Sequence, residues 1–379
     1  MIKNKYQICK NCVMDTSDSK ITFDLNGLCD HCIDFKTDVE SKWFPNEEGK
    51  RRLDKTVAKI KKDGQKRDFD CILGMSGGVD SSYMLHLAVK ELGLRPLVFH
   101  VDSGWNSERA VKNIQIMIDK LGLDLYTNVI NWEEMKDLQL AFFKSGVPHI
   151  DLPQDHAYMA SLFNFANEHN IKYILNGGNI STECVRNPME WIYYGTDMSQ
   201  VNDIRKRFGK NKMETFPFSL IFKHKIYLRY FKGLKMIRPL DNMKYNKNLA
   251  TKVLKKEYGW KPYPQKHFES RFTRFYEAYW LPERFGFDTR RVQFSSLILT
   301  NQLTREEAIE ELKKPAYNPQ TIDEEFNYVA TKLGITSEKL REYFNLPKKF
   351  YWDYKNQQVL FKIGAKVLKL LGVEKSIKR

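Results

Sequence analysis

The chain has 379 residues, of which 42% are hydrophobic and 29% are charged, and this composition excludes a disordered protein and indicates two or three folded domains. Its net charge of +15 indicates an anionic partner, although a lysine-rich proteome would produce the same excess. No apolar stretch approaches the ~20 residues that cross a bilayer, and no signal-peptide pattern precedes Cys9, so we expect a cytoplasmic protein without membrane insertion.

The first 40 residues contain two close pairs of cysteines, Cys9 with Cys12 and Cys29 with Cys32. Each Cys-x-x-Cys turn can supply two thiolates, and four thiolates complete a closed tetrahedral shell around Zn²⁺. A redox dithiol is the alternative use of such a pair, but two pairs at this spacing favour zinc. We therefore expect a zinc ribbon with a structural Zn²⁺ over residues 1–40.

An apolar run at Phe69–Leu73 is followed by Gly77, Gly78 and a stretch of helical periodicity at Ser82–Leu92. This pattern predicts a buried strand, a tight loop and a helix. Glycines let backbone N–H groups approach a ligand, and free N–H groups at a helix start favour an anion. The loop is not a Walker A motif, because no lysine precedes Ser81. We expect a phosphate-binding loop, with an ordinary Gly-Gly turn as the alternative.

Strand and helix patterns alternate along the unit that we place at residues 41–245. Further strands are expected at Pro96–Val101, Leu125–Ile130 and Lys172–Leu175, and helices at Arg51–Lys66, Ser107–Leu121 and His156–Glu168. This alternation predicts an α/β fold, with a parallel sheet and helices on both faces. Ligands of such sheets bind beyond the carboxyl ends of the strands, where the phosphate loop, Val101–Trp105 and Asn176–Asn179 fall.

The pattern becomes mainly helical over residues 246–379, which we expect to serve substrate or partner binding. Helices are expected at Asn248–Tyr258, Phe268–Tyr279, Thr304–Leu312, Thr321–Leu333 and Gln357–Leu371. Glutamates three residues after Thr304 and Thr321 predict capping boxes at two of these helix starts.

Cations and aromatic residues are crowded together between residues 258 and 280. The aromatic side chains fall on one helical stripe, which is more typical of a core than of a ligand site. Lys266, His267, Arg271 and Arg274 form a basic cluster beside a turn rich in glycine and proline. These four residues are candidates for phosphate or carboxylate recognition.

The predicted phosphate loop resembles, at all six motif positions, the Ser-Gly-Gly-x-Asp-Ser loop of the N-type ATP pyrophosphatases, the PP-loop superfamily. That resemblance implies cleavage of ATP between its α and β phosphates and transfer of AMP to an oxygen of the substrate. The residues that it assigns to ATP binding are Ser76, Gly77, Gly78, Asp80, Ser81, Ser82, Val101, Asp102, Gly177 and Gly178. It also places Asp80 to bind Mg²⁺.

Four features carry a second resemblance: the ribbon cysteines, the phosphate loop, Glu183–Pro188 and Lys266–Arg274. Together they make about residues 5–315 similar to the N-acetyl sugar amidotransferase family, the WbpG/PseA-like enzymes of O-antigen, lipopolysaccharide and related surface glycan synthesis. The resemblance implies that an acetamido group on a nucleotide-linked, N-acetylated sugar is converted to an acetamidino group. ATP would adenylate the amide oxygen and ammonia would displace AMP, while Mg²⁺ and cations stabilise the phosphate charge.

The same resemblance suggests catalytic roles for three residues. Asp80 would bind Mg²⁺, Lys266 would contact the phosphates, and Glu183 would position the substrate or transfer a proton. An ion pair between Glu183 and Arg186 is the structural alternative for that glutamate. The candidates for substrate binding are Arg186, His267, Arg271 and Arg274.

The source of ammonia is expected to be another polypeptide. Glutamine hydrolysis needs a nucleophile, and outside the ribbon only Cys71 and Cys184 remain, neither in a recognisable glutaminase setting. The family resemblance points to a HisH/HisF-like pair of glutaminase and barrel as the partner.

Two other functions are compatible with parts of the sequence. A tRNA-modifying enzyme of the same superfamily would let sulfur or an amine attack adenylated RNA. Sulfur insertion generally needs a reactive cysteine, however, and no separate RNA-binding domain is apparent, so nucleic acid is not the expected partner. A zinc-ribbon binding module without enzymatic activity would not need the phosphate loop.

Overall fold

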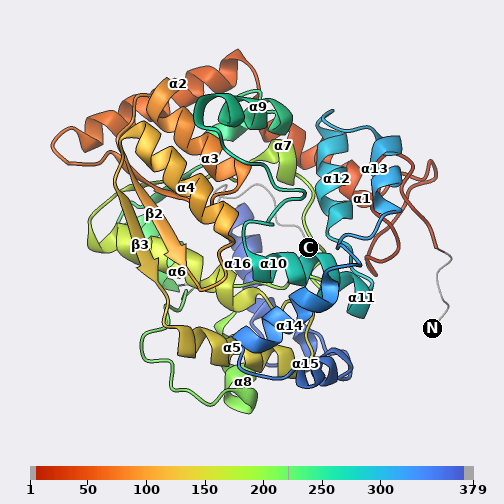
Figure 1. Ribbon diagram of the computed structural model, residues 1–379. Coiled ribbons are helices and arrows are strands. Elements are labelled where there is room, and N and C mark those ends of the chain that lie inside the picture. The colour runs from red at the N-terminus through yellow and green to blue at the C-terminus, as the bar shows by residue number, and fades with distance from the viewer. Residues whose placement is uncertain (1–5, 221, 371–379) are drawn as a thin grey trace.

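The centre of the molecule is a sheet of five strands, each parallel to its neighbours. A computed structural model describes residues 6–220 and 222–370, with the strands in the order β3-β2-β1-β4-β5 (Figure 1). The strands are β1 Cys71–Gly74, β2 Pro96–Asp102, β3 Leu125–Val129, β4 Tyr173–Leu175 and β5 Lys235–Ile237. The sequence predicts the first four. It does not predict β5, which is three residues long and mostly exposed at the edge of the sheet.

Helices occupy most of the remaining described chain. The α-helices before β5 are α1 Asp30–Asp34, α2 Glu47–Gly64, α3 Val79–His86, α4 Glu108–Leu121, α5 Trp132–Ser145, α6 Leu152–Glu168, α7 Ile180–Glu183 and α8 Met198–Phe208. Those after β5 are α9 Lys247–Tyr258, α10 Arg271–Phe275, α11 Leu281–Phe285, α12 Arg290–Leu299, α13 Arg305–Leu312, α14 Ile322–Lys332, α15 Ser337–Phe344 and α16 Gln358–Leu370. Short 3₁₀ or π segments are η1 Phe35–Val39, η2 Glu40–Lys42, η3 Leu87–Glu91, η4 Phe222–Phe231, η5 Pro239–Asn242, η6 Tyr276–Trp280 and η7 Tyr351–Asp353.

Alternate residues of β1 face opposite helix layers. Cys71 and Leu73 pack into a core with residues of α2, α3, α4 and α9, whereas Ile72 packs on the other side with residues of α5 and α6. Both faces of the strand are therefore apolar, which explains its continuous hydrophobic run. The predicted α/β fold, a parallel sheet with helices on both faces, is confirmed.

The middle strand β1 lies at the point where the chain reverses its direction across the sheet. Ile72 pairs with Leu97 of β2 on one side and with Ile174 of β4 on the other. The connections after β1 and β4 therefore leave the sheet toward opposite edges, and a crevice forms between the carboxyl ends of these two strands.

A third core joins the N-terminal cysteine segment to the helices that follow β5. The backbone N–H of Val13 donates to the Ser295 hydroxyl of α12 at 3.2 Å. The Arg305 guanidinium of α13 donates to the carbonyl oxygens of Cys9 and Cys12. In Figure 1, α1 accordingly lies beside α12 and α13, although these segments are far apart in the sequence. The division into residues 1–40, 41–245 and 246–379 stays a prediction.

Two helix starts differ in their caps. The capping box predicted at Thr304 is confirmed, because its hydroxyl accepts from the Glu307 N–H and the Glu307 carboxylate accepts from the Thr304 N–H. The one predicted at Thr321 is wrong. Thr321 has φ −116° and ψ 1°, outside the extended range of an N-cap, and its side chain caps no N–H group of α14.

Several boundaries also differ from the predictions. The helix expected from Phe268 begins at Arg271, where Ser270 accepts a capping hydrogen bond from the Thr273 N–H, and it continues as the π segment η6. Helix α5 is not predicted, because its buried face includes polar residues such as Gln139. Leu371 of the last expected helix and residues 1–5 lie outside the described residues.

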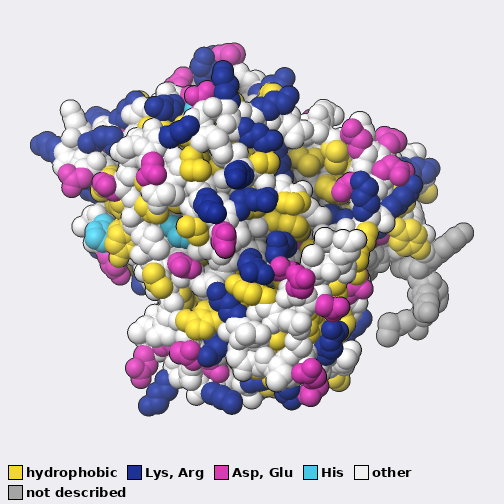
Figure 2. Space-filling view, viewed as in Figure 1, with side chains coloured by type: hydrophobic (Ala, Val, Ile, Leu, Met, Phe, Trp, Pro, Cys, Tyr) yellow, Lys and Arg dark blue, Asp and Glu magenta, His cyan; other side chains and the backbone are white. Residues whose placement is uncertain are grey.

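Charge is distributed without one dominant patch on the face shown in Figure 2, where lysine, arginine and acidic side chains are interspersed. The face shown in Figure 2 therefore lacks a continuous basic surface of the kind that binds nucleic acid. In the described part of the chain, no helix combines the length and the apolar character needed to span a membrane.

Candidate active site and metal centre

The predicted phosphate loop connects β1 to α3. Gly77 has a φ of +83°, which favours glycine, and a Cβ there would lie 3.0 Å from the Ala110 carbonyl oxygen. The Gly78 N–H donates to the Ser76 hydroxyl at 3.2 Å, and that hydroxyl lies 3.1 Å from the Ser81 hydroxyl. Two hydroxyls and free backbone N–H groups therefore converge at the start of α3, an arrangement suited to an anion.

The loop after β4 lies directly against the phosphate loop. A Cβ on Gly177 would lie 2.8 Å from the Asp80 carbonyl oxygen, so glycine is needed for this close approach. The Asn179 side chain donates to the Asp80 carboxylate at 3.4 Å. The two loops thus meet at the crevice between β1 and β4, where the sheet topology predicts a ligand.

A cavity of about 410 Å³ opens between these two loops and the segment that joins α9 to α10. This volume falls in the range of small-molecule sites. The predicted site residues that line the cavity are Ser76, Gly78, Asp80, Ser81, Gly177, Gly178, Glu183, Lys266 and His267. Residues from β1, β4 and the helical region, which are distant in sequence, therefore share one site.

Lys266 is the central cation of this cavity. Its ammonium group lies 2.6 Å from the Glu183 carboxylate and 3.6 Å from the Asp80 carboxylate, and its side chain is 11% exposed. Burial lowers the pKa of Lys266, but the two carboxylates outweigh burial and raise the pKa above its ordinary value. Burial raises the pKa of Glu183, and the Lys266 charge outweighs it and lowers the pKa. Lys266 and Glu183 are therefore both charged at neutral pH, and no ion pair joins Glu183 to Arg186 among the residues described.

His267 adds a second cation beside Lys266. It has a φ of +65°, which is strained for a non-glycine residue, and its Nδ1 lies 2.9 Å from the Glu277 carboxylate. Burial lowers the pKa of His267, but the Glu277 carboxylate outweighs burial and raises the pKa to about 9. The imidazole is therefore protonated at neutral pH and can attract a phosphate or carboxylate.

The His267–Glu277 pair predicts a pH dependence of stability. Because the folded-state pKa of about 9 exceeds the unfolded value of ~6.5, the stabilisation is complete below the unfolded pKa and is lost as pH rises through 9. After allowance for the 43% exposure of the His267 side chain, about 1 kcal/mol is expected. Thermal unfolding of wild type and His267→Gln between about pH 6 and pH 10 should show the steeper loss in the wild type. Equal losses in the two proteins would contradict this interpretation.

Three further residues of the site were not recognised in the sequence. Tyr245 donates its hydroxyl to the Asp80 carboxylate at 2.5 Å. Glu269 accepts from the Ser76 hydroxyl at 3.2 Å, which brings a carboxylate into the phosphate loop. Lys247 lines the same cavity, and burial lowers its pKa. Glu269 lies within the basic cluster, between His267 and Arg271, and its position there is a local signal, whereas nothing local marks Tyr245 or Lys247.

Some predicted ATP-binding residues lie outside the cavity lining. Val101 is buried in the core, and the Asp102 carboxylate accepts from the Gly104 N–H and the Asn106 side chain. The Ser82 hydroxyl is fully buried. Gly77 contributes its backbone to the loop, and its carbonyl oxygen accepts from the Tyr263 hydroxyl. Nucleotide binding by Val101 and Asp102 stays a prediction.

Three predicted substrate-binding arginines are also outside this cavity. Arg271 and Arg274 both pair with one oxygen of Glu325, at 3.0 and 2.6 Å, and the Arg271 guanidinium stacks over Tyr328 at 3.4 Å. These contacts hold α10 against α14. Arg186 is exposed on the chain after α7. A substrate role for the three arginines stays a prediction.

The four ribbon cysteines gather into one buried cluster. Their sulfur atoms all lie within 4.8 Å of one another, with separations of 3.7 Å for Cys9–Cys32, 3.5 Å for Cys12–Cys29 and 3.7 Å for Cys29–Cys32. A tetrahedral zinc site with Zn–S distances of ~2.3 Å places its sulfurs ~3.8 Å apart. The cluster therefore fits a single tetrahedral metal ion. A four-iron cluster would need more widely spaced sulfurs.

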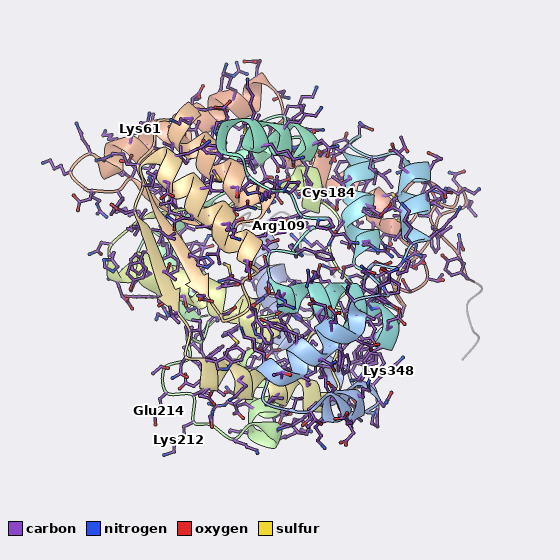
Figure 3. The ribbon with its side chains drawn as sticks, in the orientation of Figure 1. Lys61, Arg109, Cys184, Lys212, Glu214 and Lys348 are labelled. Carbon is purple, nitrogen blue, oxygen red and sulfur yellow. The ribbon has the colours of Figure 1, made fainter. Side chains whose placement is uncertain are left out.

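The two remaining cysteines are poor nucleophiles. Cys71 is buried in β1, and burial raises its pKa. Burial also raises the pKa of Cys184 to about 12, and its thiol faces the Ser296 carbonyl oxygen of α12. Figure 3 shows Cys184 next to α7, close to α12. Burial therefore disfavours the thiolate form of both side chains, which is the form that acts as a nucleophile.

Solved structures with detectable similarity to this chain include a thiolase and two synthetases. A U34-tRNA thiolase NcsA from Methanococcus maripaludis, solved with its [4Fe-4S] cluster, is 16% identical with a TM-score of 0.30, over 58% of this chain and 67% of that one. An NH₃-dependent NAD synthetase from Campylobacter jejuni is 15% identical with a TM-score of 0.29, over 57% and 99%. An NMN synthetase from Francisella tularensis is 16% identical with a TM-score of 0.30, over 58% and 98%. No curated protein sequence matches the chain.

Two family models match separate parts of the chain. A model described as NAD synthase matches residues 52–221, which include the phosphate loop and the first four strands. A model described as "LPS biosynthesis protein WbpG-like, C-terminal domain" matches residues 269–368, which extend from Glu269 into α16. The chain therefore carries a C-terminal domain of the WbpG-like family after a domain similar to NAD synthase of the PP-loop superfamily, and the two matches together support an ATP-using enzyme.

Proposed function

We propose that this chain is an ATP-dependent, AMP-forming amidotransferase of bacterial surface polysaccharide synthesis in the cytoplasm. Its substrate would be a nucleotide-linked, N-acetylated sugar whose acetamido group becomes an acetamidino group. The observation that carries the proposal is the meeting of the phosphate loop with Lys266, Asp80 and Glu183 in one cavity, in a chain with a WbpG-like C-terminal domain.

An amide oxygen is a poor leaving group, so activation must precede exchange of oxygen for nitrogen. The phosphate loop would hold the β and γ phosphates while the amide oxygen attacks the α-phosphorus, and pyrophosphate leaves with the electron pair of the broken P–O bond. Ammonia then attacks the activated carbon, and AMP departs with the former amide oxygen. Lys266 and His267 would stabilise the phosphate charge, and Glu183 would position the substrate or accept a proton.

The donor set of the cavity is compatible with Mg²⁺. Asp80 and Glu269 present carboxylate oxygens beside the phosphate loop, and these are ligands that Mg²⁺ prefers. Bound there with ATP, Mg²⁺ would supply charge neutralisation at the phosphates. For the four-cysteine cluster we propose a structural Zn²⁺, because the sulfur spacing leaves no open coordination position.

The proposal is tested by supplying the purified chain with ATP, Mg²⁺, an ammonium salt and a panel of free and nucleotide-linked acetamido sugars, with RNA as a control substrate. We expect AMP and pyrophosphate, together with a sugar product in which mass spectrometry detects replacement of oxygen by NH. ADP and orthophosphate as direct products, or AMP formation that depends on RNA, would refute it.

Ammonia is proposed to come from a glutaminase and barrel pair of the HisH/HisF type. Ammonium has no lone pair for attack. Cys71 is buried and Cys184 is half-buried with a raised pKa, so neither thiol of the described residues outside the cysteine cluster is suited to glutamine hydrolysis. The chain alone should therefore use ammonium salts but not glutamine, and glutamine use should appear when the pair is added. Glutamine-dependent product from this chain alone, free of other glutaminases, would exclude the idea.

A further inference from the structure

A second, smaller cavity adjoins the phosphate-loop cavity. Its volume is about 200 Å³, and Lys247, Gln265 and Lys266 line both cavities. The remaining lining residues are Thr182, Pro264, Arg290, Gln293, Phe294, Leu297 and Glu311. The phosphate-loop cavity and the smaller cavity are therefore neighbours, and Lys247 and Lys266 lie at the boundary between them.

The lining of the smaller cavity is divided into an apolar and a polar part. Phe294 and Leu297 of α12 supply apolar surface, one of them aromatic. The Thr182 hydroxyl is buried and has no hydrogen-bond partner, and the side-chain amide of Gln293 forms no hydrogen bond within residues 6–220 and 222–370. The buried Thr182 hydroxyl indicates a ligand or water that would satisfy it, and the half-buried Gln293 amide is free to bind the same ligand.

The lining of the smaller cavity is not suited to binding a second phosphate. Arg290 is the arginine in its lining, but its guanidinium is held by the Asp288 carboxylate and by the carbonyl oxygens of Glu311 and Lys314. It is therefore a fixed part of the wall with its donors in use. Positive charge is found instead at the boundary, where the Lys247 ammonium group forms no hydrogen bond or ion pair within residues 6–220 and 222–370. Burial lowers the pKa of Lys247, and the more distant Asp80 and Glu269 carboxylates oppose that effect.

We infer that the smaller cavity holds the sugar ring of the acceptor, with its acetamido group directed across the Lys247–Lys266 boundary toward the α-phosphate of ATP. This inference rests on the proposed function. A sugar ring has apolar C–H faces and a polar rim, which match Phe294 and Leu297 on one side and Gln293 and Thr182 on the other. In this arrangement Lys247 and Lys266 lie beside the α-phosphate. The amide oxygen would form its bond to the α-phosphorus there, as pyrophosphate departs. The arginine pair Arg271 and Arg274, held by Glu325, plays no part in this arrangement.

The test compares Gln293→Ala and Phe294→Leu with wild type and with Gln115→Ala, a matched change on the exposed surface of α4. In ammonium-dependent turnover, each cavity variant should raise the KM for the acceptor by about 10-fold, while the KM for ATP stays within about twofold. The Phe294→Leu change keeps an apolar side chain, which protects the packing of α12. Gln115→Ala should leave both KM values unchanged.

Calorimetric titration of UDP-N-acetylglucosamine in the presence of a non-hydrolysable ATP analogue provides a readout without turnover. Binding that is weaker in both variants supports the inference. Wild-type turnover together with unchanged acceptor KM values in correctly folded variants would overturn it and leave the proposed function intact. If the wild type binds the sugar, the variants bind it more weakly and the wild type nevertheless forms no AMP, the proposed function alone is overturned. If the wild type neither binds nor converts any acetamido sugar, both the inferred sugar site and the proposed function are refuted.

Discussion

Replacing Asp80 with asparagine is expected to lower the rate of AMP and pyrophosphate formation by about 10²- to 10³-fold. The Asp80 carboxylate lines the phosphate-loop cavity, accepts from the Tyr245 hydroxyl at 2.5 Å and lies 3.6 Å from the Lys266 ammonium. Asparagine keeps the size of the side chain but removes the charge that would bind Mg²⁺. Initial rates measured by pyrophosphate release over a range of Mg²⁺ concentrations test this expectation.

The control for this experiment is Asp119→Asn. The Asp119 side chain lies on the exposed side of α4, and its carboxylate accepts a local hydrogen bond from Gln115 and none from other described residues, so its neutralisation should not affect turnover. Circular dichroism and thermal unfolding establish that both variants fold. An Asp80→Asn protein that keeps the wild-type rate would show that the carboxylate has no part in phosphate chemistry.

Replacing Cys29 with serine is expected to remove the bound metal and to lower the free energy of unfolding by several kcal/mol. Cys29 is fully buried, and its sulfur lies 3.5 Å from that of Cys12 and 3.7 Å from that of Cys32. Without the metal, like charges or unpaired thiols would crowd together in the core that also contains Val292 of α12. Metal analysis of protein purified without chelator, combined with thermal unfolding, measures both effects.

Cys184→Ser is the matched control for the metal experiment. Cys184 lies outside the cluster and its side chain faces the Ser296 carbonyl oxygen, to which a serine hydroxyl can also donate. This variant should keep one metal ion per chain and unfold close to the wild-type temperature. Wild-type protein that contains no metal would count decisively against a metal centre.

The sequence is sufficient to predict those parts of the site that are encoded within short segments. The phosphate loop needs adjacent glycines and hydroxyls between a strand and a helix, and the metal cluster needs two Cys-x-x-Cys turns. Both patterns are local, so they can be read without knowledge of the fold. The alternation of strands and helices likewise predicts the parallel sheet, because its central strands β1, β2 and β4 are buried on both faces.

Contacts between distant segments could not be predicted in this way. Arg271 and Arg274 have the composition of an anion site, yet both guanidinium groups pair with Glu325, a residue about fifty positions away. Tyr245 contributes its hydroxyl to Asp80 across 165 positions. Because a single sequence does not show which segments pack together, such partners become visible only in the folded molecule.

The docking of the cysteine segment on Arg305 has a consequence for how the chain is made. The hydrogen bonds from Arg305 to Cys9 and Cys12 join residues separated by more than 290 positions. During synthesis the cysteine segment emerges from the ribosome before the sheet, whereas α12 and α13 are translated after the sheet is complete. The wall that α12 contributes to the smaller cavity is therefore completed late. A nascent chain interrupted before α12 would therefore contain the phosphate loop but lack one wall of the smaller cavity.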